Sequence, residues 1–143
     1  VTAQNAYSLL DRGIETDLLP LCVEAGIGLL PYYPLANGIL TGKYRRGVRP
    51  PAGTRLGDGG THGPTTLNDG IIDTVDALDR IARDNGFEVL DLAVSWLAGR
   101  EGVSSVIAGA RTPEQAVRNA RSANWQMKEA DRAAIEAALK PLT

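Results

Sequence analysis

The sequence predicts an α/β fold in which parallel strands alternate with helices. Three short apolar segments have strand character: TAQNAY at 2–7, GIGLLPYYPL at 26–35 and VSSVIAG at 103–109. Helical patterns lie between them, and strands separated by helices are typical of βα units that build a parallel sheet. At 143 residues the chain has the length of one domain, so we treat 1–143 as a single segment.

Five helices are predicted between and after these strands. The evidence is the spacing of apolar residues and the presence of residues that end helices. Gly26 ends the first helix, and Asn85-Gly86 ends the second. The predicted ranges are 15–25, 71–82, 88–99, 113–122 and 129–139.

A long segment at 41–66 connects the second strand to the second helix. It is rich in Gly and Pro and carries five Lys or Arg residues. Segments of this length without secondary structure are usually functional or mobile. Its GDGGTHG stretch has no strand before it and no helix opening from its last glycine, so it is not a dinucleotide fingerprint. We predict a flexible loop within the domain.

Composition argues against several classes of function. Fifteen basic and seventeen acidic residues give a formal charge of −2, which implies no general attraction to nucleic acid or to an anionic membrane. No apolar run approaches the length of a bilayer, and no signal segment is visible. Cys22, the only cysteine, fits a reducing cytoplasm. His62, the only histidine, lies in a glycine-rich stretch, so we expect no metal site.

Arg111 stands at the start of the predicted helix 113–122 and raises the question of an anion there. Thr112 is a suitable N-cap, Pro113 suits the first helical position, and Gln115 completes a capping box. The first-turn N–H groups and the helix dipole favour an anion, and an arginine adds a planar fork of donors. The alternative is a solvated loop arginine beside an ordinary capped helix.

Ligands of parallel α/β sheets gather at the carboxyl ends of the strands. An amide there can pair with a carboxamide, and a tyrosine ring can stack on a flat ring. The edge contains no obvious catalytic pair. Lys43 is a candidate phosphate contact, with a surface lysine as the alternative. The residues that the rule selects are Gln4, Asn5, Tyr7, Tyr32, Tyr33, Pro34, Leu35, Asn37, Gly38, Gly109 and Arg111.

Four stretches resemble, in order and at suitable spacing, the C-terminal part of the aldo-keto reductases in the branch close to the potassium-channel β-subunits. They are QNAYSLLDR (4–12), PYYPLANGILTGKY (31–44), VLDLAVSWLAG (89–99) and IAGARTPEQAVRN (107–119). The resemblance covers essentially the whole chain. It implies a (β/α)₈ barrel that uses NADPH to reduce carbonyls, with this chain spanning about strands 6–8. The anion near Arg111 would then be the 2′-phosphate of NADP(H).

The resemblance also implies cofactor-binding roles for eleven residues. Gln4 matches a glutamine that bonds the nicotinamide carboxamide, and Tyr32 matches an aromatic residue that stacks on the nicotinamide ring. The pyrophosphate stretch is matched by Leu35, Asn37, Gly38, Leu40 and Lys43, and the surroundings of the 2′-phosphate and adenine by Gly109, Arg111, Gln115 and Asn119. Two departures stand out: Tyr33 replaces a small serine, and Arg118 replaces a glutamate near the adenine.

No residue matches the family's catalytic Asp, Tyr, Lys and His, which lie in the first half of the barrel, so we assign no catalytic residue. A barrel needs roughly 200 residues or more, and three strands alone would leave an apolar face and unpaired edges. The chain opens VTAQ without Met, which fits either an alternative start codon or a piece of something longer.

The function expected from the resemblance is the cofactor-binding C-terminal segment of an NADPH-dependent reductase of aldehydes or ketones. The alternatives are a non-catalytic nucleotide-binding or subunit-interaction module, and an inactive truncated remnant. We expect a small carbonyl substrate in the complete barrel and no nucleic acid or membrane partner. The open strands would be covered by a second copy or by a missing N-terminal half.

Overall fold

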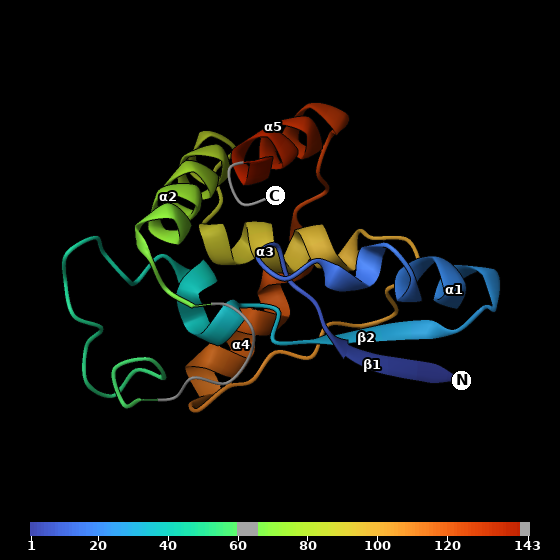
Figure 1. The fold of residues 1–143 in the computed structure, drawn as a ribbon, viewed down its shortest axis with the longest axis horizontal. Coiled ribbons are helices and arrows are strands. Elements are labelled where there is room, and N and C mark those ends of the chain that lie inside the picture. The colour runs from blue at the N-terminus through green and yellow to red at the C-terminus, as the bar shows by residue number, and fades with distance from the viewer. Residues whose placement is uncertain (60–65, 141–143) are drawn as a thin grey trace.

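The computed structural model describes residues 1–59 and 66–140 and has the predicted α/β character (Figure 1). His62 and the part of the GDGGTHG stretch beyond Gly59 lie outside the described residues. The elements, in chain order, are β1 (Thr2–Ala6), η1 (Gly13–Glu15), α1 (Leu18–Glu24), β2 (Gly28–Tyr32), η2 (Ala36–Thr41), α2 (Asp69–Asp84), α3 (Val89–Ala98), α4 (Pro113–Arg121), η3 (Ser122–Asn124) and α5 (Glu129–Leu139).

The first two strands pair in parallel, as predicted, but β2 ends at Tyr32 and does not reach Leu35. Thr2 lies opposite Gly28 and Ala6 lies opposite Tyr32, so the two strands end at the same edge. The helix predicted at 15–25 is in fact a short 3₁₀ turn, η1, followed by α1. The other four helices lie within two residues of their predicted bounds.

The prediction of a regular third strand at 103–109 is wrong. This segment runs beside β2 in parallel but forms only two isolated bridges, at Val103 and Ile107. The Ser104 N–H donates to the Leu29 carbonyl at 2.9 Å, and the Ile107 N–H donates to the Pro31 carbonyl at 2.8 Å. Pro31 has no N–H with which to continue the ladder, and the next bonded amide lies one residue farther along than in a regular strand. Proline in the middle of a sheet thus gives a bulged segment.

Helix α3 forms the centre of the hydrophobic core. Leu92, Ala93 and Leu97 are fully buried, and Trp96 is 1% exposed. Figure 1 shows α2 and α5 side by side over α3, on the side away from β1 and β2. The Ser95 hydroxyl donates to the Ser122 carbonyl at 2.7 Å, which fixes η3 against the same helix. Helix α3 is therefore the element against which α2 and η3 pack.

A cluster of charged and aromatic side chains joins the end of β1 to α3 and α5. The Tyr7 ring is fully buried and lies edge-on to Trp96, and its hydroxyl donates to Glu15 at 2.6 Å. Arg12 and Arg100 both form ion pairs with Glu15, at 2.8 and 3.1 Å. Their guanidinium groups lie 5.2 and 5.0 Å from the Trp96 ring. Tyr7 was among the residues predicted to lie at the carboxyl ends of the strands, where ligands gather. Its ring packs in the core instead.

Glu15 is the acid that holds this cluster together. Its partial burial raises its pKa, but hydrogen bonds from Arg12 and Tyr7 and the nearby charges of Arg100 and Arg12 outweigh burial and lower the pKa below its usual value. Between the lowered folded-state pKa and the ordinary pKa, the unfolded chain binds the proton more readily. Stability from Glu15 is therefore complete above the ordinary pKa and is lost as pH falls through the folded-state pKa.

We predict that Glu15→Gln lowers the free energy of unfolding at pH 7 by about 1.5–3 kcal/mol, because charge-assisted hydrogen bonds are lost. Urea unfolding from pH 7 down to acid measures this, and the gap to wild type should close as Glu15 itself becomes protonated. Glu24→Gln, at an exposed acid that ends α1, is the matched control. A gap that stays constant into strong acid, or that is equal in the control, would contradict the prediction.

Candidate functional site

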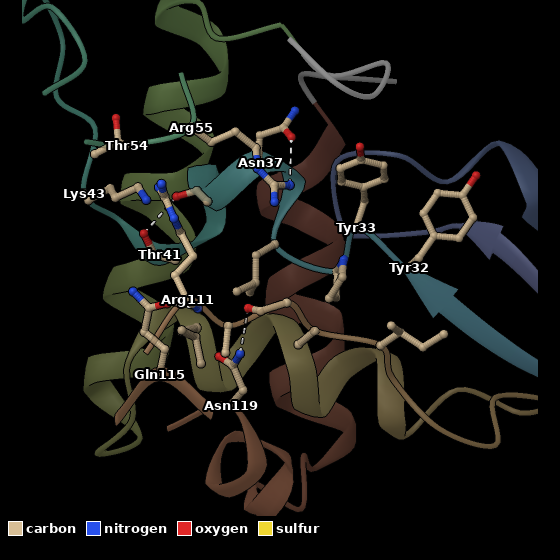
Figure 2. A pocket seen from close by; sticks show the side chains of 18 of the residues that line it. Tyr32, Tyr33, Asn37, Thr41, Lys43, Thr54, Arg55, Arg111, Gln115 and Asn119 are labelled. Carbon is tan, nitrogen blue, oxygen red and sulfur yellow. Dashed lines mark hydrogen bonds between the residues drawn. The ribbon is translucent and has the colours of Figure 1, made fainter. Parts of the chain in front are cut away.

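The structure places a pocket of about 660 Å³ at the carboxyl end of β2 (Figure 2). Its walls come from the turn after β2, from the loop at 53–55, from the segment at 107–111 and from the first turns of α4. Nine of the eleven predicted cofactor residues line it: Tyr32, Leu35, Asn37, Gly38, Lys43, Gly109, Arg111, Gln115 and Asn119. Segments separated by some seventy residues in the chain are thus brought to one site.

Two predicted residues do not line the pocket. Gln4 lies in the middle of β1, opposite Leu30, with its side chain exposed. Leu40 is fully buried and belongs to the hydrophobic core. Leu40 therefore supports the pocket wall from behind, and Gln4 faces outward at the edge of the two-stranded sheet.

The turn after β2 holds an unusual run of left-handed backbone. Tyr33, Ala36 and Asn37 have φ values of 59°, 44° and 60°, and Gly38 follows at 82°. Non-glycine residues rarely adopt such angles, and they cluster at functional sites where the surroundings impose them. The Tyr44 hydroxyl donates to the Asn37 carbonyl at 3.4 Å, and the Thr41 hydroxyl donates to the Gly38 carbonyl at 2.8 Å. These two hydrogen bonds hold the turn in this conformation beside the pocket.

The start of α4 is fixed to the segment before it. The Gln115 N–H donates to the Thr112 hydroxyl at 3.3 Å, as a capping box requires. The return bond differs from the prediction, because the Gln115 side-chain oxygen accepts from the Arg111 N–H at 2.8 Å. The Asn119 amide donates to the Gly109 carbonyl at 3.1 Å. The helix therefore anchors the Gly109–Arg111 backbone as well as capping itself.

Three cationic side chains, Lys43, Arg55 and Arg111, line this pocket. Within the described residues none of the three forms an ion pair with a carboxylate. Arg111 donates to the Gly53 carbonyl at 3.1 Å, and Arg55 donates to the Asn37 side-chain oxygen at 3.5 Å. The Lys43 ammonium lies 5.3 Å from the Tyr44 ring. Cations gathered in one cavity without counter-charges favour an anionic ligand.

Arg118 behaves differently from these cations. It forms ion pairs with Asp91 at 2.6 Å and with Glu88 at 2.8 Å, and it does not line the pocket. Hydrogen bonds to Asp91 and Glu88 raise its pKa above the ordinary arginine value. Its bonds clamp α4 onto the first turn of α3, so its place in the fold is explained by packing.

Sequence reasoning missed the contribution of the long loop. Gly53, Thr54 and Arg55 line the pocket, and so do Leu90 of α3 and Ile107. The signal that could have identified this contribution was the five Lys and Arg residues at 41–66. The composition of the segment led us to predict a flexible loop instead. Among the described residues no group of three or more His, Cys, Asp or Glu side chains could hold a metal ion, and no helix is long and apolar enough to cross a membrane.

Gly38 lines the pocket at a position where both the backbone conformation and a close neighbour oppose a side chain. A Cβ there would lie 2.7 Å from the Lys43 ammonium, at a φ of 82°. We predict that Gly38→Ala lowers the free energy of unfolding by about 1–2 kcal/mol, because the left-handed conformation is costly for any other residue. Thermal or urea unfolding measures the change.

The matched control for this prediction is Gly13→Ala. Gly13 has no positive φ and no atom within 4 Å of a Cβ, so we expect a change within about 0.5 kcal/mol. Equal stability of the two variants would contradict the account of the turn.

Comparisons with known proteins identify the family to which the chain belongs. The family profile described as the aldo/keto reductase family matches residues 1–140. A protein of Arabidopsis thaliana described as a probable voltage-gated potassium channel subunit beta is 36% identical over 124 residues, which cover 85% of this chain and 38% of that protein. The NADH-specific methylglyoxal reductase of Escherichia coli K12 is 32% identical over 128 residues, which cover 90% of this chain and 38% of that enzyme.

A solved structure shows the same fold. The glycerol dehydrogenase of Gluconobacter oxydans superposes with a TM-score of 0.82 at 25% identity, over 99% of this chain and 43% of that enzyme. The chain therefore spans less than half the length of the relatives that it matches. On the evidence of the family profile and of these relatives, the chain belongs to the aldo/keto reductase family.

Proposed function

We propose that this chain is the cofactor-binding C-terminal segment of an NADP(H)-dependent oxidoreductase that reduces aldehydes or ketones. The observation that carries the proposal is the pocket with three cations and no counter-charge among the described residues. Family membership supports an oxidoreductase role. The match to less than half of each relative supports a place in a larger (β/α)₈ barrel, at about strands 6–8.

The residues present fit a phosphorylated dinucleotide. Lys43 and Arg55 supply cations for a diphosphate beside the turn after β2, where Asn37 and Gly38 bend the backbone. Arg111 and the first turn of α4 supply donors for a further phosphate. The Tyr32 side chain is 38% exposed at the pocket wall, which leaves its ring available for stacking on a flat ring.

The chemistry that the cofactor supplies when bound is hydride transfer to a carbonyl carbon. The residues of this chain bind and orient the cofactor, and we assign none of them a role in proton transfer. A carbonyl substrate would therefore be held and protonated by residues outside the stretches described above. For this reason we propose that this chain alone has no reductase activity.

In this proposal, Arg111 determines the preference of the site for NADP(H) over NAD(H). NADP(H) differs from NAD(H) by one phosphate on the adenosine ribose, and Arg111 lies at the helix start that would receive it. One relative carries the name NADH-specific, so family membership alone leaves the choice open. Among the described residues, the Arg111 guanidinium makes one hydrogen bond, to the Gly53 carbonyl, which keeps most of its donors available.

We predict that Arg111→Ala weakens binding of adenosine 2′,5′-bisphosphate by about ten- to 150-fold, the equivalent of one charge-assisted contact of about 1.5–3 kcal/mol. Binding of adenosine 5′-monophosphate, which lacks the 2′-phosphate, should hardly change. Calorimetric titration of both nucleotides measures the difference.

Arg121→Ala is the control for this titration, because Arg121 is an exposed arginine in the last turn of the same helix and does not line the pocket. It should leave both affinities as in wild type. Equal losses for the two nucleotides in Arg111→Ala, or tighter wild-type binding of the nucleotide without the 2′-phosphate, would contradict the choice of NADP(H).

We also propose that the chain associates through its open strand edge. Among the described residues β1 pairs with β2 alone, so its other edge has free backbone groups. Exposed strand edges readily pair with another chain. The partner would be either a second copy or the remainder of a barrel.

We predict that the isolated chain forms dimers or larger assemblies at micromolar concentration. Multi-angle light scattering after size-exclusion chromatography measures the mass, and circular dichroism checks that the sample is folded. A folded, stable monomer at that concentration would overturn this proposal without bearing on the cofactor site.

A further inference from the structure

Tyr33 departs from the small serine expected at its position, and the structure gives its ring a specific neighbour. The Arg55 guanidinium lies 5.8 Å from the centre of the Tyr33 ring. The ring of the preceding residue, Tyr32, is also close. The centres of the Tyr32 and Tyr33 rings are 5.4 Å apart, and the ring planes form an angle of 59°. Figure 2 shows Tyr33 and Arg55 among the side chains that line the pocket, with the Arg55–Asn37 hydrogen bond dashed.

The backbone of Tyr33 is held in an unfavourable conformation. Its φ is 59°, which a bulky residue rarely adopts, and the following Pro34 restricts it further. Such a conformation persists only where the surroundings hold it. Among the described residues, the Tyr33 ring contacts the Tyr32 ring and the Arg55 guanidinium. The strained turn thus presents an aromatic face to the long loop.

Arg55 has few other interactions to fix it. Its hydrogen bond to the Asn37 side chain is 3.5 Å long, at the limit for such a bond. It forms no ion pair with a carboxylate of the described residues, in contrast to Arg46 of the same loop, which pairs with Asp69 and Asp73 of α2. The ring of Tyr33 is therefore the main contact that keeps the Arg55 guanidinium at the pocket.

We propose that Tyr33 is a positioning residue that holds Arg55, and with it the loop at 53–55, over the diphosphate end of the pocket through a cation–π contact. The loop is also tied at Gly53, whose carbonyl accepts from Arg111. The proposal rests on the proposed function for the identity of the anion, but the ring–guanidinium contact belongs to the ligand-free chain. The two can therefore be tested separately.

The first experiment uses the ligand-free chain and limited trypsin digestion. The ratio of cleavage after Arg55 to cleavage after Arg46 reports how firmly Arg55 is held, because the Arg46 ion pairs provide an internal reference. Tyr33→Leu removes the π face but keeps a bulky side chain at the strained position. We expect the ratio to rise about two- to five-fold, the size of an exposed cation–π contact.

Tyr33→Phe is the matched variant, since it keeps the ring and loses only the hydroxyl. It should show the wild-type ratio, and circular dichroism should show that both variants are folded. An unchanged ratio in Tyr33→Leu would overturn the proposal. An equal rise in Tyr33→Phe and Tyr33→Leu would also overturn it, because the effect would then come from the hydroxyl or from the strained turn.

The second experiment measures binding of inorganic pyrophosphate by calorimetry. Tyr33→Leu should weaken binding about two- to five-fold and Tyr33→Phe should not, because Arg55 stays in place only in the second variant. Wild-type affinity in Tyr33→Leu would overturn the role of Tyr33 at the site. Absence of pyrophosphate binding by every variant, wild type included, would count against the proposed function, while the trypsin ratio would still decide the ring–guanidinium contact.

Discussion

Hydrogen bonds on both sides of β2 set the positions of the segments that form the walls of the pocket. β1 pairs with one side of the strand, and the segment from Val103 to Ile107 pairs with the other. Because both partners run parallel to β2, the turn after Tyr32 and the loop before α4 emerge at the same edge. The bulge caused by Pro31 lies one residue before that edge. The bond from the Ile107 N–H to the Pro31 carbonyl therefore fixes how the two walls of the pocket face each other.

The distribution of charge separates structural cations from those of the pocket. Arg12, Arg100 and Arg118 each contact at least one carboxylate, and these ion pairs join helices and strands in the folded chain. Lys43, Arg55 and Arg111 contact only carbonyl or amide oxygens and aromatic rings among the described residues. An uncompensated cluster of like charges lowers stability through self-repulsion, and an anionic ligand removes that repulsion. This electrostatic difference is the main reason for regarding the pocket as a binding site.

Short-range signals in the sequence predicted most of the local elements, and the resemblance to the family added pocket residues such as Gln115 and Asn119 that those signals did not select. Apolar spacing located four helices closely. The rule that ligands gather at the carboxyl ends of parallel strands placed Asn37 and Arg111 at the same edge. Three features depend on tertiary contacts, and sequence patterns did not predict them. The bulge follows from Pro31 lying between two partner segments, and the burial of Tyr7 follows from its contacts with Glu15 and Trp96. The place of Arg55 at the pocket follows from the long loop lying against the turn after β2.

Chemical-shift mapping of NADPH binding on the isotope-labelled chain tests the central claim most directly. The account predicts that the perturbed amides belong to the turn at 32–38, to Lys43, to the loop at 53–55 and to the segment at 107–119. It also predicts that the Tyr7 and Arg12 cluster, which lies outside the pocket, stays unperturbed. Perturbations confined to other surfaces, or no perturbation at millimolar NADPH, would contradict the claim that this pocket is a nucleotide site.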